Sequence, residues 1–322
     1  MIRLILAALL LASTAAAQQT PRVWRVGFLG DGSRAERLAI NVEPFREGLR
    51  ELGYVEGRNL VIEERWTEGR GERLRDLAAE LVRLKVDVIV THGVRATQAV
   101  QAATTTIPIV FATAPDVIST KIVASLARPG GNTTGMTDQV TELAEKELQI
   151  LKEAVPRLKR IAILWTENNP GARATFDQTS KAAEKLGLAV DVVGVKGPDE
   201  LEAAVARAAK GRPDALVVVH DIVTVNNRAR IAHAAIKFKL PSICGSTPYV
   251  DAGGLITYAA STPALFKRSA AFVDRILKGA KPADIPIEQP TSFQLRINLK
   301  TARALGLTIS PALLARADDI IQ

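Results

Sequence analysis

The sequence predicts an α/β protein of two lobes, each built around an open parallel sheet. Its 322 residues are about twice a typical domain length. Short apolar or β-branched runs alternate with segments of helical spacing, which is the pattern of βαβ units. The same order of elements then starts again near residue 160, so the second half repeats the first.

The first half contains runs of strand length at Val23–Leu29, Leu60–Trp66, Val86–Thr91 and Ile107–Ala112. Two segments between them carry apolar residues spaced 3, 4 and 3 positions apart, which makes one stripe along a helix. The stripes consist of Val42, Phe45, Leu49 and Leu52 and of Leu74, Leu77, Leu81 and Leu84. Each stripe is expected to cover a face of the first sheet.

The second half has matching strand candidates at Ile161–Trp165, Leu188–Val193, Ala215–His220 and Ser242–Gly245. A helical stripe between the first two consists of Ala172, Phe176, Thr179, Ala183 and Leu186. Four landmarks correspond between the halves at separations of 127 to 135 residues, among them Arg25 with Arg160 and Asp87 with Asp214. Such separations favour two lobes of like topology. The alternative is chance, because one landmark, Leu-Gly after a helix, is a common cap.

Residues 1–17 have the form of a cleaved secretory signal peptide. Arg3 supplies a positive charge, Leu4–Ala12 form a short apolar core, and Ala15-Ala16-Ala17 is a small-residue cleavage site. The apolar run is shorter than the roughly 20 residues needed to cross a bilayer. We therefore expect export to the periplasm, with an uncleaved N-terminal anchor as the alternative.

Composition and charge narrow the class of partner. The chain has 42 basic and 34 acidic side chains and a formal charge of +8, but its basic residues are spread along helical faces. We therefore expect no nucleic acid partner. One cysteine, Cys244, and three histidines give no disulfide and no zinc pattern. The sequence contains no P-loop, nucleophile elbow or paired-carboxylate motif, so we expect neither a cofactor nor enzymatic activity.

In open parallel sheets, ligands bind beyond the carboxyl ends of the strands, where loops and helix N-termini converge. This rule selects residues in both halves of the chain. The candidate ligand-binding residues of the first half are Asp31, Gly32, Gly93, Arg95, Ala96, Thr97 and Asp116. Those of the second half are Trp165, Asn168, Asn169, Asp221, Ser246 and Tyr249. If the lobes face each other, the two sets form opposite walls of one cleft.

These candidates suit a small polar solute. The backbone N–H groups of Gly93–Thr97 are expected at a helix N-terminus, which attracts anions. Asp116 and Asp221 offer acceptors for an ammonium or hydroxyl group from opposite walls. Trp165 is a candidate aromatic wall, with core packing as the alternative. For Asp31 the alternative is a cap on the first helix.

Five segments carry a family pattern, at Phe45–Gly57, Leu77–Val82, Ile107–Phe111, Leu126–Gly135 and Asn298–Ala302. They resemble the substrate-binding proteins of ABC importers, in the group that includes tryptophan- and tyrosine-binding members. The likeness runs from about Trp24 to the C-terminus, and Arg-Pro-Gly-Gly-Asn at 128–132 is its most specific part. The resemblance implies a type I periplasmic-binding fold, in which two Rossmann-like lobes, joined by a multi-strand hinge, close on a small solute.

The resemblance also implies how the chain is divided, but it does not imply which solute is bound. The N-terminal lobe is expected from residues 24–134 plus 252–286, and the C-terminal lobe from 135–251 plus 287–322. The ligand is expected from the candidate residues instead: they fit a small polar or aromatic solute, which is an amino acid, a small aromatic carboxylate or a purine-like solute. The expected protein partners are an ABC permease and its ATPase subunits, and the receptor is expected to be a monomer. A periplasmic sensor subunit and an enzyme on the same fold are the alternatives.

The chain departs from the family pattern after two strands. Members with amino-acid ligands tend to carry Thr-Pro-Ala-Ala where this sequence has Val94-Arg95-Ala96-Thr97. They also tend to have a small residue, Asp and Pro where it has Pro115-Asp116-Val117. A cleft-facing Arg95 would favour a carboxylate or phosphate through a bidentate pair. The alternative is an Arg95 that points to solvent.

Two features of the sequence point to other kinds of site. Residues Gly30–Ala35 fit the loose dinucleotide fingerprint, but Arg65-Trp66-Thr67 provides no acid at the tip of the second strand. His92 and His220 follow corresponding strands near two aspartates, which is one way to gather a metal. A hydrogen-bonded loop histidine is the commoner arrangement, so no metal is expected.

Overall fold

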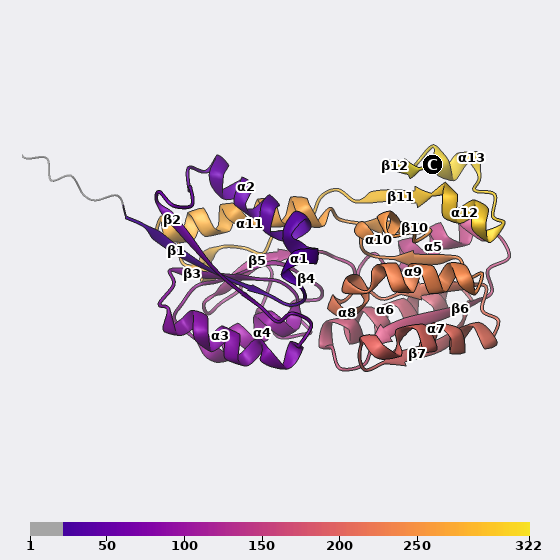
Figure 1. The fold of residues 1–322 in the computed structure, drawn as a ribbon, viewed down its shortest axis with the longest axis horizontal. Helices are drawn as coiled ribbons and strands as arrows, with labels where there is room; N and C mark the ends of the chain where they lie inside the picture. The colour runs from indigo at the N-terminus through magenta and orange to yellow at the C-terminus, as the bar shows by residue number, and fades with distance from the viewer. Residues whose placement is uncertain (1–21) are drawn as a thin grey trace, which may run out of the picture.

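The computed structural model describes residues 22–322, so the expected signal peptide lies outside the described residues. The chain forms two separate sheets with helices around each, and the two lobes lie side by side (Figure 1). Every strand pair but one is parallel. The predicted α/β class with two parallel-sheet lobes is therefore confirmed.

The first sheet has the strand order β2-β1-β3-β4-β5. Its strands are β1 (Trp24–Gly30), β2 (Leu60–Trp66), β3 (Val88–Thr91), β4 (Ile109–Ala114) and β5 (Thr133–Thr137). Its helices are α1 (Arg34–Arg37), α2 (Glu43–Glu51), α3 (Leu74–Arg83), α4 (Val94–Ala103) and α11 (Thr262–Leu277). Helices α2 and α11 lie on one face and α3 and α4 on the other (Figure 1).

Burial on both faces follows from the alternation of side chains along each strand. In β1, Phe28 packs with Phe45 of α2 and Phe266 of α11. The next residue, Leu29, points the other way and packs with Leu77 and other residues of α3. The predicted stripes therefore cover opposite faces of one sheet.

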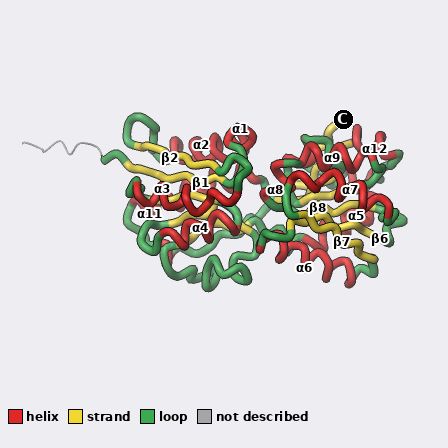
Figure 2. The backbone as a smooth tube through the Cα atoms, turned by 60° about the horizontal axis from the view of Figure 1, so that its bottom comes forward, coloured by secondary structure: helices red, strands yellow, loops and turns green. Residues whose placement is uncertain are grey.

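The second sheet has the order β12-β11-β10-β9-β8-β6-β7. Its strands are β6 (Arg160–Thr166), β7 (Ala189–Val195), β8 (Ala215–Val218), β9 (Ser242–Cys244), β10 (Ile256–Ala259), β11 (Gln294–Asn298) and β12 (Asp319–Ile321). Its helices are α5 (Ala144–Ala154), α6 (Pro170–Lys185), α7 (Leu201–Lys210), α8 (Ile222–Asn226), α9 (Arg228–Lys237), α10 (Pro248–Asp251), α12 (Leu299–Leu305) and α13 (Pro311–Leu314). Figure 2 shows helices on both sides of these strands.

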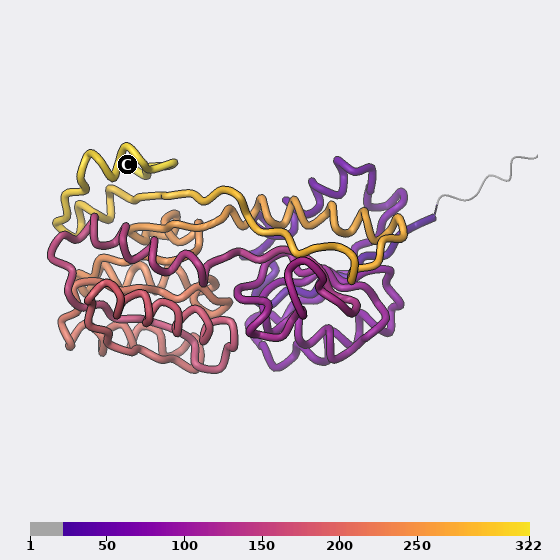
Figure 3. Tube along the Cα trace, turned by 180° about the vertical axis from the view of Figure 1, so that it is seen from behind, coloured from indigo at the N-terminus to yellow at the C-terminus, as the bar shows by residue number. Residues whose placement is uncertain are grey.

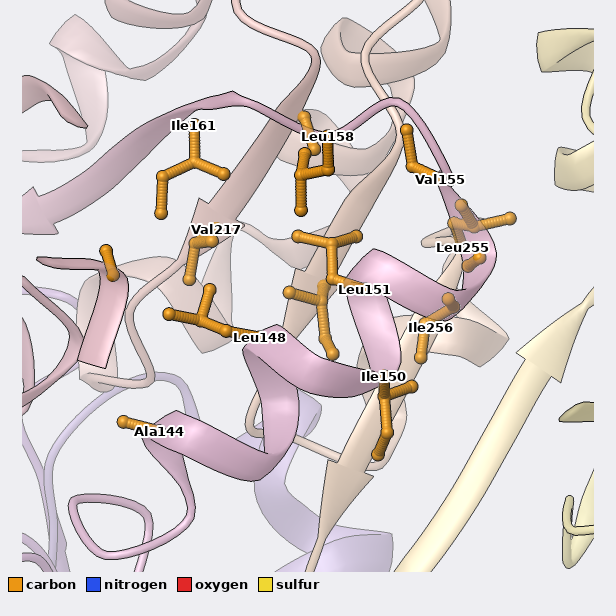
Figure 4. Close-up of a cluster of buried hydrophobic side chains, with 14 of the residues drawn as sticks. Ala144, Leu148, Ile150, Leu151, Val155, Leu158, Ile161, Val217, Leu255 and Ile256 are labelled. Carbon is orange, nitrogen blue, oxygen red and sulfur yellow. The ribbon is translucent and has the colours of Figure 1, made fainter. Parts of the chain in front are cut away.

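The largest core cluster lies between α5 and the second sheet (Figure 4). Leu148 and Leu151 of α5 are fully buried against residues such as Ile161 and Val217. On the opposite face, α7 and α9 bury a second cluster that includes Leu216 of β8. Both faces of this sheet are therefore apolar, as in the first lobe.

The chain crosses between the lobes in three segments, at 138–143, 260–261 and 289–293 (Figure 3). The expected return to the first lobe at residue 252 is too early, because β10 pairs with β9 and β11 of the second sheet. The expected boundary between residues 134 and 135 falls inside β5, since residues 133–137 form the edge strand of the first sheet. Helix α11 packs on α2, so it belongs to the first lobe, to which the expected range 252–286 assigns it.

Two further expectations need correction. Leu52 was assigned to the apolar stripe of α2, but it follows the helix and is 40% exposed. The pattern of apolar and β-branched runs also predicts no strand at β5, β10, β11 or β12, which are three to five residues long. Within residues 22–322, no helix is both long and apolar enough to span a membrane.

Candidate functional site

A cavity between the lobes is lined by the carboxyl ends of strands and by helix N-termini from both sides. Its volume is about 70 Å³, several times the roughly 10–15 Å³ that one buried water needs. Polar lining residues before the first crossover are Asp31, Arg37, Asn41, His92, Arg95 and Thr113. Asp138 lies in the first crossover, and the polar lining residues after it are Asn169, His220, Asp221, Ser246 and Thr262.

The N-terminus of α4 opens onto this cavity. Gly93 precedes the helix with φ of 74°, a left-handed conformation that glycine adopts without strain. Its N–H donates to the Thr113 carbonyl at 2.8 Å, which fixes the loop to the end of β4. The N–H groups of the first helical turn have no partner inside the helix. They therefore offer donors and partial positive charge to a ligand.

Arg37 and Asn41 enter the cavity from α1 and the π-helical turn Leu38–Val42 that follows it. Such π-helical turns are rare and concentrate at functional sites. The Arg37 side chain is buried, and its Nε donates to Asn226 Oδ1 at 2.9 Å. Burial, followed by the nearby Arg228 charge, lowers the pKa of Arg37 to about 10, so it remains a cation near neutral pH.

Asn41 is fully buried, and neither atom of its side-chain amide has a hydrogen-bond partner among the described residues. A buried amide without partners costs about 1–3 kcal/mol for each lost bond. A ligand that supplies one donor and one acceptor would remove this cost.

The two histidines of the cavity are neutral. Burial, followed by the Arg37 charge, lowers the pKa of His92 to about 3. Burial also lowers the pKa of His220. His92 Nε2 and His220 Nδ1 lack partners within the described part of the chain, so each is available to a ligand. The described residues include no group of three or more side chains that would hold a metal.

Three carboxylates line the same cavity, and each already accepts hydrogen bonds from the protein. Asp31 accepts from the Thr67 hydroxyl at 3.0 Å, and Asp138 accepts from the Thr113 hydroxyl at 2.7 Å. Asp221 caps α8 by accepting from the Thr224 N–H at 2.8 Å. Burial raises the pKa of Asp31, and the nearby Arg95 opposes that shift.

Seven of the predicted site residues line the cavity. They are Asp31, Gly93, Arg95, Ala96, Asn169, Asp221 and Ser246. Asp31 does not cap the first helix, because the N-cap residue of α1 is Ser33. Arg95 faces the cavity and an adjoining surface hollow rather than open solvent alone.

The structure places the other six predicted residues elsewhere. Tyr249 is fully buried in the second lobe and donates to Ser242 Oγ at 2.7 Å. Trp165 stacks on Phe176 at 4.6 Å in the core under α6, so the core alternative holds. The Asp116 carboxylate turns back to accept from Ser119, because its backbone is left-handed with φ of 37°.

The last three of the predicted residues also lie outside the cavity lining. Thr97 is buried, and its hydroxyl donates to the Gly93 carbonyl within α4. Asn168 is exposed in the turn before α6. Gly32 lines the adjoining hollow, where a Cβ would overlap the side-chain amide of Asn226.

Sequence reasoning missed Arg37, Asn41, Asp138 and Phe266, although all of them line the cavity. Arg37 and Asn41 lie 7 and 11 residues beyond the end of β1, past the loop at the strand end. Phe266 comes from α11, which returns to the first lobe long after the expected strands.

The two lobes touch directly around the cavity. Arg37 of the first lobe bonds Asn226 of the second. A Cβ at Gly171, in the first turn of α6, would lie 2.9 Å from Val94 Cγ2 and 3.1 Å from Pro115 Cγ. The structure therefore shows the lobes closed over the cavity.

A two-lobed α/β fold with a polar cavity between its lobes defines a class of protein that binds small solutes. Residues 35–321 match the family described as ABC transporter substrate binding protein, and the chain belongs to that family.

Three known proteins are similar over most of the chain. A tyrosine-binding protein of Clostridioides difficile strain R20291 is 25% identical over 263 residues, which are 82% of this chain and 75% of that protein. A crystal structure of an ABC domain in complex with L-Trp from Streptococcus pneumonia has a TM-score of 0.87 and 27% identity, and covers 93% of this chain and 100% of that one. A leucine binding protein from Thermotoga maritima shares the type I periplasmic fold, with a TM-score of 0.63, 13% identity, and coverage of 88% and 87%.

Proposed function

We propose that this chain is the extracytoplasmic receptor of an ABC importer and that it binds an amino acid or a carboxylate-like solute in the cavity between its lobes. The solute contacts both walls, so it favours the closed arrangement by its differential affinity. The closed receptor then delivers the solute to the permease without changing it chemically.

The observation that carries this proposal is the set of unpartnered polar atoms in the cavity. Asn41, His92 and His220 each present at least one buried atom without a partner among the described residues. They surround a cavity that also holds the Arg37 cation and carboxylates. Buried polar groups are normally hydrogen-bonded, so this set favours a polar ligand that bonds them.

An amino acid matches the mixture of charges. Its carboxylate suits Arg37 and the N-terminus of α4, and its ammonium suits the oxygen atoms of Asp31 and Asp138. Apolar lining residues such as Phe266 and Ile222 suit the rest of the solute. The tyrosine and L-Trp ligands of the two similar proteins support this class of solute.

The location and partners belong to the same proposal. The signal-peptide pattern of residues 1–17 supports export to the periplasm. Membership of the family supports an ABC permease and its ATPase subunits as partners. The sequence contains no P-loop, nucleophile elbow or paired-carboxylate motif that would support an enzyme.

The test is the melting temperature of residues 18–322 against amino acids, organic acids, nucleosides and sugars, after bound ligand is removed by unfolding and refolding. A ligand at about a hundred times its Kd should add about 2.7 kcal/mol of stability. We expect a saturable rise for one class of compound, which is recovered unchanged. No rise with any compound contradicts the proposal, and consumption of the compound favours an enzyme.

A matched pair of variants locates the site. Arg37→Gln should lower the affinity by about tenfold or more, because hydrogen bonds to charged groups contribute about 1.5–3 kcal/mol. Arg34→Gln is the control, since Arg34 lies on the same short helix but pairs with Glu64 at the surface. Equal affinities for both variants would contradict the assignment of the cavity.

A further inference from the structure

Arg95 occupies the boundary between the cavity and the adjoining hollow at the surface. It is the second residue of α4, it is half-buried, and it lines both spaces. The turn at Gly71 closes over its guanidinium so tightly that a Cβ at Gly71 would overlap Arg95 Nη2. The guanidinium therefore lies against Gly71, which lines the adjoining hollow.

The Arg95 guanidinium has no acceptor of its own. Within residues 22–322 it makes no hydrogen bond and no ion pair, whereas other arginines near the same strand ends do. Arg34 pairs with Glu64, and Arg65 pairs with Glu80. The nearby Asp31 acts on Arg95 only as a charge at longer range, and its carboxylate is bonded to Thr67.

Hydrogen-bond donors without partners are concentrated on the wall of the cavity that the first lobe forms. Among the described residues, Arg37 donates only through its Nε, to Asn226, and the first turn of α4 adds backbone N–H groups. The carboxylates of the cavity already accept hydrogen bonds from protein groups. The cavity therefore offers more donors than one ligand carboxylate would use.

We propose that Arg95 determines specificity by binding a second anionic oxygen group of the solute. The preferred ligand is then a small solute with two oxyanion groups, such as an acidic amino acid or a dicarboxylate, rather than tyrosine or tryptophan. One oxyanion lies with Arg37 and the α4 N-terminus, and the other forms a bidentate pair with Arg95. This inference rests on the proposed receptor function and names the class of solute.

The experiment compares pairs of solutes that differ in one charged group. The probes are L-glutamate with L-glutamine, succinate, O-phospho-L-serine with L-serine, and L-tryptophan and L-tyrosine, and each Kd is measured by calorimetry. The proteins are the wild type, Arg95→Gln, Arg95→Lys and Arg83→Gln. Arg83→Gln is the control because it removes the same charge at an exposed position. Arg83 ends α3, at the opposite end of the lobe.

We expect the wild type to bind an acidic probe more tightly than its neutral partner. Arg95→Gln should weaken the acidic probe by about 10- to 100-fold, as expected for lost charge-assisted hydrogen bonds, while it changes the neutral partner little. Arg95→Lys should restore part of the loss, and Arg83→Gln should match the wild type. A larger effect on phosphoserine than on glutamate would assign the second group to a phosphate.

Three results would overturn the inference. If the wild type prefers neutral solutes, or if Arg95→Gln weakens acidic and neutral probes alike, the inference fails and the receptor function stands. If neither these probes nor the wider panel binds the wild type, the proposed function fails and the inference fails with it.

Discussion

Asn41 illustrates how a ligand-binding residue differs from a structural residue. Its amide is fully buried without a partner among the described residues, so it contributes a cost to the closed, empty protein. Asn41→Leu, which keeps the branched shape, should therefore leave the ligand-free melting temperature equal or higher. The affinity should fall by about 30-fold for the loss of two hydrogen bonds of about 1 kcal/mol each.

Asn59→Leu provides the opposite control. The Asn59 side chain accepts from the Val55 N–H at 2.7 Å and donates to the Gly53 carbonyl at 3.0 Å, so it holds a turn far from the cavity. This variant should melt earlier and bind normally. If Asn41→Leu behaved in the same way, Asn41 would be a structural residue.

Glu147 of α5 predicts an unusual pH dependence. It is buried, its Oε1 has no partner in the described chain, and burial raises its pKa to about 8. The folded protein then holds a proton that the unfolded chain, with a pKa near 4.5, releases. The free energy of unfolding should fall as the pH rises from about 4.5 to about 8, by at most about 1.4 kcal/mol per pH unit.

The measurement is urea unfolding of the wild type and Glu147→Gln across this range. Above the usual histidine pKa of about 6.5, both buried histidines are neutral in either state and add no slope. Glu147→Gln should therefore gain stability relative to the wild type as the pH rises toward 8. Glu145→Gln, on the same helix but paired with Lys185 at the surface, should follow the wild type. Parallel curves for Glu147→Gln would mean that the folded state does not protonate Glu147.

At the scale of elements, closure brings the first turns of α4 and α6 together. Gly171 lies in the first turn of α6, and a Cβ there would press on Val94 and Pro115 of the other lobe. Gly171→Ala should therefore weaken ligand binding by about 5- to 30-fold, the equivalent of about 1–2 kcal/mol of overpacking. The ligand-free stability should not fall, because the lobes can separate and alanine favours helix.

Gly197→Ala is the matched control for this prediction. Its backbone is extended, and a Cβ at this position would have open space around it. Calorimetry and melting curves of the two variants separate the effects. Unchanged affinity in Gly171→Ala would mean that the bound lobes stand further apart than they do here.

The elements that carry clear apolar runs or stripes could be predicted from the sequence, and the others could not. Apolar runs and stripes at helical spacing located β1 to β4, β6 to β9 and the helices α2, α3 and α6, because both faces of each sheet must be buried. Strand β5 reads Thr-Thr-Gly-Met-Thr, and its Gly135 has room for no Cβ beside Phe111. Such a sequence forms a strand only because its neighbour β4 supplies the partner.

The site was only partly predictable for a related reason. Seven of the thirteen residues predicted from strand ends line the cavity, but the direction of each side chain depends on the local backbone. Asp116 turns away because its φ is positive, and Trp165 faces α6 because of its position in the pleat. Arg37, Asn41 and Phe266 reach the cavity from a π-helical turn and from a helix that returns from the other lobe. No local sequence pattern predicts that these three residues come together at the cavity.

At the scale of the whole molecule, binding and closure should be one equilibrium. Three crossing segments join the lobes, and the contacts across the cavity are few, chiefly Arg37 with Asn226 and the approach of α4 to α6. A ligand that contacts both walls stabilises only the closed arrangement, so the ligand-free protein should populate open arrangements. Small-angle X-ray scattering should therefore record a smaller radius of gyration when saturating ligand is added.

Asn226→Ala tests whether the bond from Arg37 supports closure rather than ligand contact. Asn226 lies outside the cavity lining, yet its side chain meets both Arg37 and Gly32 of the opposite lobe. The variant should need about tenfold more ligand, since one hydrogen bond to a charged group is lost. At saturation it should reach the same radius of gyration as the wild type, because the ligand still bridges the walls. If the radius of gyration of the wild type does not change at saturation, the cavity fills without hinge motion. The loss of affinity in Asn226→Ala would then reflect a distorted Arg37 rather than a weakened closed state.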